Sequence, residues 1–217
     1  MTSRLVIGMT GATGAIYGVR LLEALRGTRF ESHLVVSEWA RKTIAIETGH
    51  RPEDVLALAD RVYREDNQAA AISSGSFVTE GMIIAPCSVK TLAAVANGFA
   101  DNLVARAADV TLKERRRLVL LVRESPLNVI HLENMLTVAR AGAVVVPPVP
   151  AFYARLQSLD DMVNHTVGRL LDLFGVEHSL VRRWGGDADQ PAVPLAPLGG
   201  AAGQPTPTRG PADDYRT

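Results

Sequence analysis

Short apolar runs alternate with amphipathic stretches along most of the chain. The apolar runs predict five buried strands, at residues 5–9, 33–37, 81–85, 117–122 and 143–146. The stretches between them carry apolar side chains at helical spacing and predict helices at residues 15–26, 38–48, 89–97, 103–114, 128–141 and 159–174. Strands that are apolar throughout are typical of a parallel sheet covered on both faces. The pattern therefore predicts an α/β fold, a doubly wound parallel sheet of the Rossmann or flavodoxin type.

The end of the chain follows no such pattern. Residues 185–217 contain six glycines and six prolines and show no apolar periodicity. A segment of this composition does not bury enough apolar surface to fold. We therefore expect one domain at residues 1–184 and a disordered Gly/Pro-rich tail at residues 185–217.

Charge and cysteine content exclude several classes of protein. The chain has 23 lysines and arginines and 23 aspartates and glutamates, so its formal net charge is zero. Proteins that bind nucleic acid or an anionic membrane need a basic excess, and we expect neither partner. No apolar run approaches the roughly 18 residues of a membrane span, and residues 1–7 are too few for a signal peptide. The single cysteine, Cys87, excludes an internal disulfide and a cysteine-built metal site, which favours a cytoplasmic location.

The candidate chemistry lies in the loops after the predicted strands, because open parallel sheets bind ligands beyond the carboxyl ends of their strands. The first loop has glycines at positions 8, 11 and 14, which let backbone amides approach an anion at the start of the next helix. The second strand ends without the carboxylate that holds the ribose of a dinucleotide. The loop thus disfavours NAD and fits flavin mononucleotide (FMN) or another single phosphate, although a simple tight turn explains it equally well.

A second polar loop spans residues 85–91. We expect Pro86 to end the third predicted strand, and Ser88 and Thr91 to cap the following helix with their hydroxyl groups. These hydroxyls and the exposed amides can also hold a phosphate or the edge of a flavin. Cys87 has no histidine near it in sequence and is expected to be a small buried residue rather than a nucleophile. Upstream, the polar stretch at residues 73–76 can fold over a ligand.

Cationic side chains gather in and between the last loops. Arg123 and Glu124 directly follow the fourth predicted strand, which places them near a ligand. Arg106 lies in an apolar stretch and needs a buried anionic partner, whereas residues 115–117 are expected to form a solvated helix face. Four cations are expected around one crevice, together with Tyr153: Arg106, Lys113, Arg123 and Arg169. Four positive charges exceed what one FMN phosphate requires. These residues indicate a flavin-type ligand plus a separate phosphorylated substrate.

A series of motifs, in one order over residues 4–185, resembles the UbiX/Pad1 family of flavin prenyltransferases. The motifs are Gly8-Met-Thr-Gly-Ala-Thr-Gly-Ala, Glu47-Thr48, Pro86-Cys-Ser, Asn102-Leu-Val, Arg106-Ala-Ala-Asp-Val, Leu112-Lys-Glu-Arg-Arg, Arg123-Glu, His131-Leu-Glu-Asn-Met-Leu, Phe152-Tyr153 and Arg183-Trp184. The stretch from Asp66 to Phe77 is most similar to the subgroup that is encoded beside hydroxyarylic acid decarboxylases.

The resemblance implies an enzyme that binds reduced FMN. It would join a dimethylallyl group, taken from dimethylallyl phosphate or diphosphate, to N5 and C6 of the flavin without a metal. The product, prenylated FMN, is the cofactor of a partner UbiD-type decarboxylase. Family members form dodecamers, so the resemblance also implies a homo-oligomer.

The resemblance also assigns roles to individual positions. The residues implied to hold FMN are Gly11, Ala12, Thr13, Ser37, Ser88, Val89, Lys90, Thr91 and Arg123. Those implied to hold the prenyl phosphate, some of them reaching from neighbouring subunits, are Arg106, Lys113, Arg123, Tyr153 and Arg169. The implied catalytic residues are Glu47, Glu124 and Thr13. Of these, Glu124 would protonate the leaving phosphate and then act as a base.

The sequence departs from the family pattern at two places, and it is compatible with two other functions. Thr13 stands where the best-studied branch has a serine, and residues 69–73 replace a segment that carries a tryptophan, which bears on the preferred donor. One alternative is an FMN-dependent decarboxylase, but the histidine after the first predicted helix, His33, lies in an apolar strand and is expected to be structural. The other alternative is a non-catalytic flavin-carrying subunit of a hydroxyarylic acid decarboxylase complex.

Overall fold

The computed structural model describes residues 3–181 and 183–185. Contacts within the chain group it into one unit at Met1–Arg183 and a second at Trp184–Thr217. Of the predicted tail, residues 186–217 lie outside the described residues. All strands and helices of the described chain belong to the first unit.

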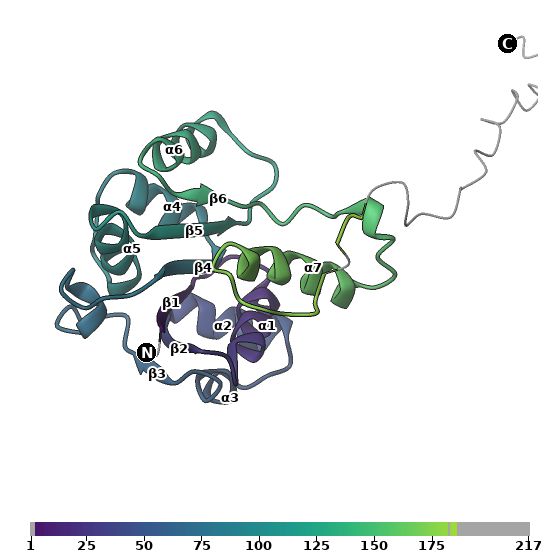
Figure 1. Cartoon of the computed structure of the whole chain (residues 1–217). Helices are drawn as coiled ribbons and strands as arrows, with labels where there is room; N and C mark the ends of the chain where they lie inside the picture. The colour runs from purple at the N-terminus through teal and green to yellow at the C-terminus, as the bar shows by residue number, and fades with distance from the viewer. Residues whose placement is uncertain (1–2, 182, 186–217) are drawn as a thin grey trace, which may run out of the picture. The chain divides into compact units, whose positions relative to one another are not determined.

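Six parallel strands form one sheet in the described part of the chain, in the order β3-β2-β1-β4-β5-β6 (Figure 1). The strands are β1 (Ser3–Met9), β2 (Phe30–Val36), β3 (Arg61–Tyr63), β4 (Gly81–Cys87), β5 (Arg117–Val122) and β6 (Val144–Val145). The five predicted strands and the doubly wound parallel sheet are confirmed. The chain winds outward from β1 in one direction and from β4 in the other, so the winding reverses between these two paired strands.

Helices cover both faces of the sheet (Figure 1). One face carries α1 (Ala15–Leu25), α2 (Glu38–Glu47) and α7 (Leu159–Asp172). The other face carries α4 (Val89–Ala96), α5 (Leu103–Lys113) and α6 (Val129–Arg140). Alternate strand residues enter the two cores, so that Ile7 and Ile83 pack on the first side and Val6 and Met82 on the second. The predicted helices are confirmed, with ends that differ by one or two residues.

The sequence pattern misses the shortest elements. Strand β3 has three residues, two of them exposed, at the edge of the sheet. Helix α3 (Pro52–Leu56) has five residues and buries Val55. The 3-10 turns η1 (Ala71–Ser73) and η2 (Phe152–Ala154) are shorter still. Such elements contain too few apolar positions for a period to show. None of the helices in the described chain combines the length and apolar composition that a membrane crossing needs.

The loop after β4 corrects two predictions. Pro86 does not end the strand, because β4 runs on to Cys87. Its pairing with β5 is irregular just here, and such a bulge accepts a residue that lacks an N–H donor. The following helix is capped by Ser88, whose side-chain oxygen accepts a hydrogen bond from the amide of Thr91. The Thr91 hydroxyl accepts a hydrogen bond from Ser88 and does not cap the helix.

Candidate active site

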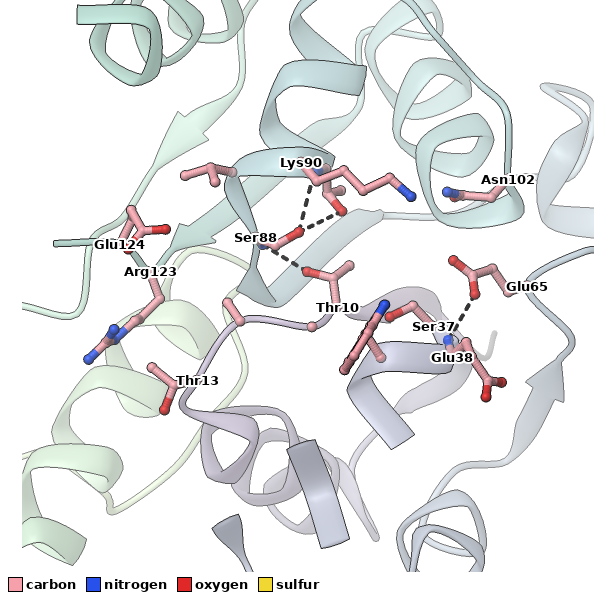
Figure 2. Close-up of a pocket in the computed structure, with 15 residues that line it drawn as sticks. Thr10, Thr13, Ser37, Glu38, Glu65, Ser88, Lys90, Asn102, Arg123 and Glu124 are labelled. Carbon is pink, nitrogen blue, oxygen red and sulfur yellow. Dashed lines mark hydrogen bonds between the residues drawn. The ribbon is translucent and has the colours of Figure 1, made fainter. Parts of the chain in front are cut away.

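Loops at the carboxyl ends of the strands surround a cavity of about 590 Å³ (Figure 2). It lies where the winding of the sheet reverses, the position at which open α/β sheets bind ligands. Its volume is in the range typical of small-molecule sites. The residues that line it are Thr10, Gly11, Ala12, Thr13, Ser37, Glu38, Trp39, Glu65, Ser88, Val89, Lys90, Thr91, Asn102, Arg123 and Glu124. They include every residue predicted to hold FMN and two of the predicted catalytic residues, Thr13 and Glu124.

Thr10 joins the two loops that meet at this point. Its amide and its hydroxyl both donate to the carbonyl oxygen of Pro86, at 3.1 and 2.9 Å. Its hydroxyl oxygen accepts a hydrogen bond from the amide of Ser88 at 2.8 Å. Thr10 is buried, so these bonds fix the loop after β1 against the loop after β4. Thr10 was not predicted, although a hydroxyl residue at a strand end within a glycine motif is the signal that marks it.

Gly11 lets helix α2 approach the glycine loop. A Cβ atom at this position would lie 2.5 Å from Cβ of Trp39, closer than two such atoms can come. The Trp39 side chain is 66% exposed and lines the cavity, and Nζ of Lys42 lies over one face of its ring, 4.4 Å from the ring centre. Trp39 was also missed by the sequence analysis, because no motif or period singles it out.

Glu47 occupies the N-terminus of α1. Its carboxylate accepts hydrogen bonds from the amides of Gly14 and Ala15, at 2.8 and 3.0 Å. Burial alone would raise the pKa of Glu47, but hydrogen bonds from the Thr13 hydroxyl and from these two amides, together with the charge of Arg123, lower it below its ordinary value. The prediction that the start of this helix meets a ligand anion is corrected: these amides hold a carboxylate of the chain itself.

Two other helix N-termini open onto the cavity. Helix α4 begins at Ser88, and residues 89–91 of its first turn line the wall. Helix α2 is capped by Ser37, whose side-chain oxygen accepts a hydrogen bond from an amide of the first turn at 3.1 Å, while the first amide of the helix, that of Glu38, already donates to the carboxylate of Glu65. Peptide dipoles favour an anion at a helix N-terminus, and Lys90 adds a full positive charge. This side of the cavity can therefore hold a phosphate.

Arg123 and Glu124 stand at the same end of the cavity as Thr13 (Figure 2). They directly follow β5, and the amide of Arg123 donates to the carbonyl oxygen of Cys87 at 3.1 Å. The carboxylate of Glu124 is exposed and accepts a hydrogen bond from the amide of Ser125 at 3.0 Å. This end of the cavity thus offers a cation on a fixed backbone beside an accessible carboxylate, the pair that an anionic leaving group needs.

Polar side chains that the sequence analysis did not assign stand at the opposite end of the cavity (Figure 2). Glu65 accepts a hydrogen bond from the amide of Glu38 at 2.9 Å, and its own carbonyl oxygen accepts one from the start of α5. Asn102 caps α5 and lines the same wall. Glu65 was missed because it follows β3, the strand that the sequence pattern does not show.

Two predicted phosphate ligands lie on α5, and neither lines the cavity. The guanidinium of Arg106 donates to the carboxylate of Asp109 at 2.7 Å and to the carbonyl oxygen of Ser73 at 3.2 Å. The expected anionic partner exists but is not buried, since the side chains of the pair are 36% and 40% exposed. The Lys113 ammonium contacts the carboxylate of Glu114.

The remaining two predicted phosphate ligands lie near α7. The hydroxyl of Tyr153, in η2, is 3.3 Å from Nε2 of His165. Arg169 donates to the carboxylate of Asp172 at 2.7 Å. Neither lines the cavity, so the expectation that Tyr153 lies in the same crevice is wrong for a single chain. The reason is topological: Tyr153 follows β6, the edge strand, and not a strand next to the reversal.

Cys87 and His33 behave as predicted. Cys87 is fully buried, and burial raises the pKa of its thiol to about 12, which leaves it unreactive as a nucleophile. His33 is 3% exposed, and its Nδ1 lies 2.9 Å from the hydroxyl of Tyr63, as suits a structural residue. Within residues 3–181 and 183–185, no three His, Cys, Asp or Glu side chains gather as metal ligands would.

Comparison with known proteins gives concordant matches. The family model described as Flavoprotein matches residues 1–171. The chain is 58% identical over 183 residues to the probable UbiX-like flavin prenyltransferase of Bacillus subtilis (strain 168), which covers 84% of this chain and 90% of that protein.

Two solved structures have the same fold at high identity. AnUbiX (PadA1) in complex with FMN and dimethylallyl pyrophosphate is 55% identical, with a TM-score of 0.84 over 86% of this chain and 99% of that one. A dodecameric FMN-dependent UbiX-like decarboxylase from Escherichia coli O157:H7 is 58% identical, with a TM-score of 0.83 over 84% of this chain and 100% of that one. The chain therefore belongs to the UbiX/Pad1 family of flavin prenyltransferases.

Proposed function

We propose that this protein is a flavin prenyltransferase. It joins a dimethylallyl group from dimethylallyl phosphate to N5 and C6 of reduced FMN, without a metal, and its product serves a UbiD-type decarboxylase. The observation that carries the proposal is the cavity between the β1 and β4 loops, with Arg123 and Glu124 at one end and the first turn of α4 in its wall. AnUbiX, solved with FMN and dimethylallyl pyrophosphate, is 55% identical to this chain.

The cavity fits FMN by the chemistry of its walls. Lys90 and the first turn of α4 suit the phosphate, while Ser37 and Glu38 can bond to the hydroxyls of the ribityl chain. The exposed ring of Trp39 and the glycine loop leave room for an aromatic ring system. When bound, reduced FMN supplies the two nucleophilic atoms, N5 and C6.

The donor phosphate requires cations that one chain does not bring to the cavity. Arg123 lines it, whereas the other predicted ligands lie on α5 and near α7. We assign those residues to neighbouring copies in a homo-oligomer: Arg106, Lys113, Tyr153 and Arg169. The E. coli relative is described as dodecameric, and we propose the same assembly for this protein.

Proton transfers fall to the two glutamates and Thr13. When the C–O bond of the donor breaks and its carbon bonds to N5, Glu124 would give its proton to the departing phosphate, Arg123 would stabilise the phosphate charge, and the N5 proton would leave. Ring closure onto C6 would use the double bond of the dimethylallyl group: its outer carbon would bond to C6, its inner carbon would take up a proton equal to the one released from N5, and Glu124 would accept the C6 proton as base. Glu47 is ionised at neutral pH because its pKa is lowered, so it can accept a proton through Thr13 but cannot supply one. The reaction uses no disulfide and suits a cytoplasmic enzyme.

The decisive experiment is anaerobic incubation of the purified protein with reduced FMN and dimethylallyl phosphate or diphosphate. Mass spectrometry should find a flavin heavier by one C5 unit, and unmodified FMN with both donors would contradict the proposal. Arg123→Ala and Glu124→Gln should slow the reaction by about a hundredfold or more while FMN still binds to Glu124→Gln. Wild-type rates in both variants would remove these residues from the mechanism.

A second candidate function is supported by one kind of observation: solved relatives, the E. coli one among them, are named as decarboxylases. The same preparation separates the two functions. Release of CO₂ from an aromatic acid by this protein alone, with unmodified FMN, would favour decarboxylation. FMN binding with neither product would favour a flavin-carrying subunit.

A further inference from the structure

Arg116 reaches from the turn after α5 to a loop much earlier in the chain. Its Nη1 donates to the carbonyl oxygen of Phe77 at 2.9 Å and its Nη2 to that of Gly75 at 2.7 Å. Arg116 is half-buried, whereas Arg115 and Arg117 are exposed. The prediction of a solvated face is therefore wrong for Arg116, whose planar fork fits two carbonyl groups at once.

Two more arginines bond to the same loop, residues 73–78. Arg106 donates to the carbonyl oxygen of Ser73, at 3.2 Å, and Arg4 to that of Val78, at 3.4 Å. The guanidinium of Arg4 also lies over the ring of Phe77, 4.6 Å from its centre. Four carbonyl groups of this loop thus turn toward guanidinium groups.

This orientation decides which loop groups remain for a ligand. The hydroxyls of Ser74 and Ser76 bond to each other at 2.9 Å. The amides of Gly75 and Ser76 donate to no acceptor within the described chain. Gly75 also lies against the end of α5, where an added Cβ would meet the carboxylate of Glu114 first and would lie 2.6 Å from Nζ of Lys113. The loop therefore presents amides and hydroxyls beside the ion pair of Lys113 and Glu114, and a phosphate bound there would take the place of the Glu114 carboxylate on Lys113.

We infer that Arg116 is a positioning residue for the phosphate of the prenyl donor. By holding the carbonyls of Gly75 and Phe77, it keeps residues 73–76 against α5, so that the loop amides, Arg106 and Lys113 form one anion-binding surface. Arg116 itself does not touch the donor. The inference rests on the proposed function, because that function makes a phosphate ester the ligand of this surface.

The test compares Arg116→Gln and Arg116→Lys with Arg115→Asn. The control removes one positive charge at the adjacent position, where φ is +55° and asparagine is tolerated. Initial rates are measured anaerobically with saturating reduced FMN and varied dimethylallyl phosphate. We expect Arg116→Gln to raise KM for the donor about tenfold with little change in kcat or FMN affinity. Arg116→Lys should be intermediate, because an ammonium lacks the planar fork.

Several outcomes would overturn the inference. Equal rises in KM for Arg116→Gln and Arg115→Asn would mean that only net charge matters. A fall in kcat at unchanged KM would place the effect elsewhere. Should Arg116→Gln fail to bind FMN, Arg116→Lys decides: a wild-type donor KM in that variant overturns the inference.

Hydrogen exchange separates this inference from the proposed function. Inorganic phosphate, added without flavin, should slow exchange in the peptide that spans residues 71–80 in wild type and Arg115→Asn, but not in Arg116→Gln. Absence of protection in wild type overturns the inference even if prenylated flavin forms. Protection without any prenylated flavin supports the inference and rejects the reaction.

Discussion

Glu47 changes how the glycine loop of this protein is understood. A carboxylate at a helix N-terminus is stabilised by peptide dipoles and by bonds from the free amides, and Glu47 has both. The Thr13 side chain also helps to lower the pKa of this carboxylate, and Thr13 itself lines the cavity. In the proposed mechanism, Thr13 therefore connects the ionised Glu47 to the cavity.

Replacing Glu47 with glutamine should slow prenylation by about a hundredfold, because the proton acceptor behind Thr13 is lost. Thr13→Val should have a similar effect, and Thr13→Ser, which keeps the hydroxyl, should remain close to wild type. Because the pKa of Glu47 lies below its ordinary value of 4.5, this residue should cause no loss of rate above about pH 5. Rates of prenylated flavin formation, with FMN affinity as the check on folding, measure all three variants. A Glu47→Gln rate equal to wild type would limit Glu47 to capping the helix.

His33 should make stability depend on pH. Burial lowers its pKa below the ordinary 6.5, although the nearby Glu31 partly opposes the shift, and its Nε2 has no hydrogen-bond partner in the described chain. Well above pH 6.5 the ring is neutral in both states. As pH falls below 6.5 the unfolded chain takes up the proton first, so the free energy of unfolding decreases, by at most about 1.4 kcal/mol per pH unit from this residue.

His33→Gln should flatten this decrease. Denaturant midpoints at several pH values between about 5 and 7.5 measure it, with the exposed His50→Gln as control. His165 has a pKa lowered in the same direction and keeps its own share of the slope in both variants. If His33→Gln and His50→Gln lose stability equally on acidification, His33 is not the responsible group.

At the scale of elements, apolar periodicity predicted the helices and strands that are long enough for the spacing to repeat. The long helices and five strands follow directly from apolar spacing, and the side of the sheet on which each helix lies follows from right-handed crossovers. Strand β3 could not be predicted, because three residues with two exposed show no alternation. Because this strand was not predicted, Glu65 was not predicted either, since its place in the cavity depends on β3. The extension of β4 past Pro86 could not be predicted either, because it depends on a local irregularity in the pairing of β4 with β5 that the sequence pattern does not show.

The C-terminal end of α7 is tied to the segment that follows it. Asp172 accepts hydrogen bonds from Arg169 at 2.7 Å, from His178 at 3.0 Å and from Arg183 at 2.8 Å. The bond from Arg183 lowers the pKa of Asp172, and His178 adds to the effect, against a smaller opposing effect of burial. A negative charge is unfavourable at this end of a helix, so it persists because these partners compensate it.

Asp172→Asn should loosen the segment after α7. The two arginines lose their charged acceptor, and we expect about 1 kcal/mol of lost stability together with faster hydrogen exchange in residues 173–181. The lowered pKa keeps this contribution constant above about pH 4 and removes it as pH falls through the pKa of the folded state. Asp160→Asn, at the exposed start of the same helix, is the control. Equal exchange in both variants would show that Asp172 does not hold the segment.

At the scale of the whole molecule, the sequence brought together the residues predicted to hold FMN, which line one cavity, but it did not place the residues predicted to hold the donor. Residues at strand ends must gather at one edge of a parallel sheet, so the position of Ser88 or Arg123 follows from the strand pattern. Arg106 lies inside a helix, and Tyr153 follows an edge strand, and neither position implies a place in the cavity. If neighbouring copies supply these residues, as proposed, their place depends on the assembly, and the apolar spacing along one chain carries no information about it.

Mixing two inactive variants tests whether neighbouring copies complete the site. Arg123→Ala removes the cation beside Glu124 in the cavity, and Arg169→Ala removes one on α7, so each variant alone should be nearly inactive. In oligomers of both chains, an Arg169→Ala copy keeps an intact cavity and an Arg123→Ala neighbour can supply Arg169. Random assembly of equal amounts should then restore about one quarter of wild-type activity, because each site needs one particular chain at each of two places. Separately assembled variants that do not exchange subunits are the control. Mixed oligomers as inactive as either variant would mean that one chain must bring both arginines to the same phosphate.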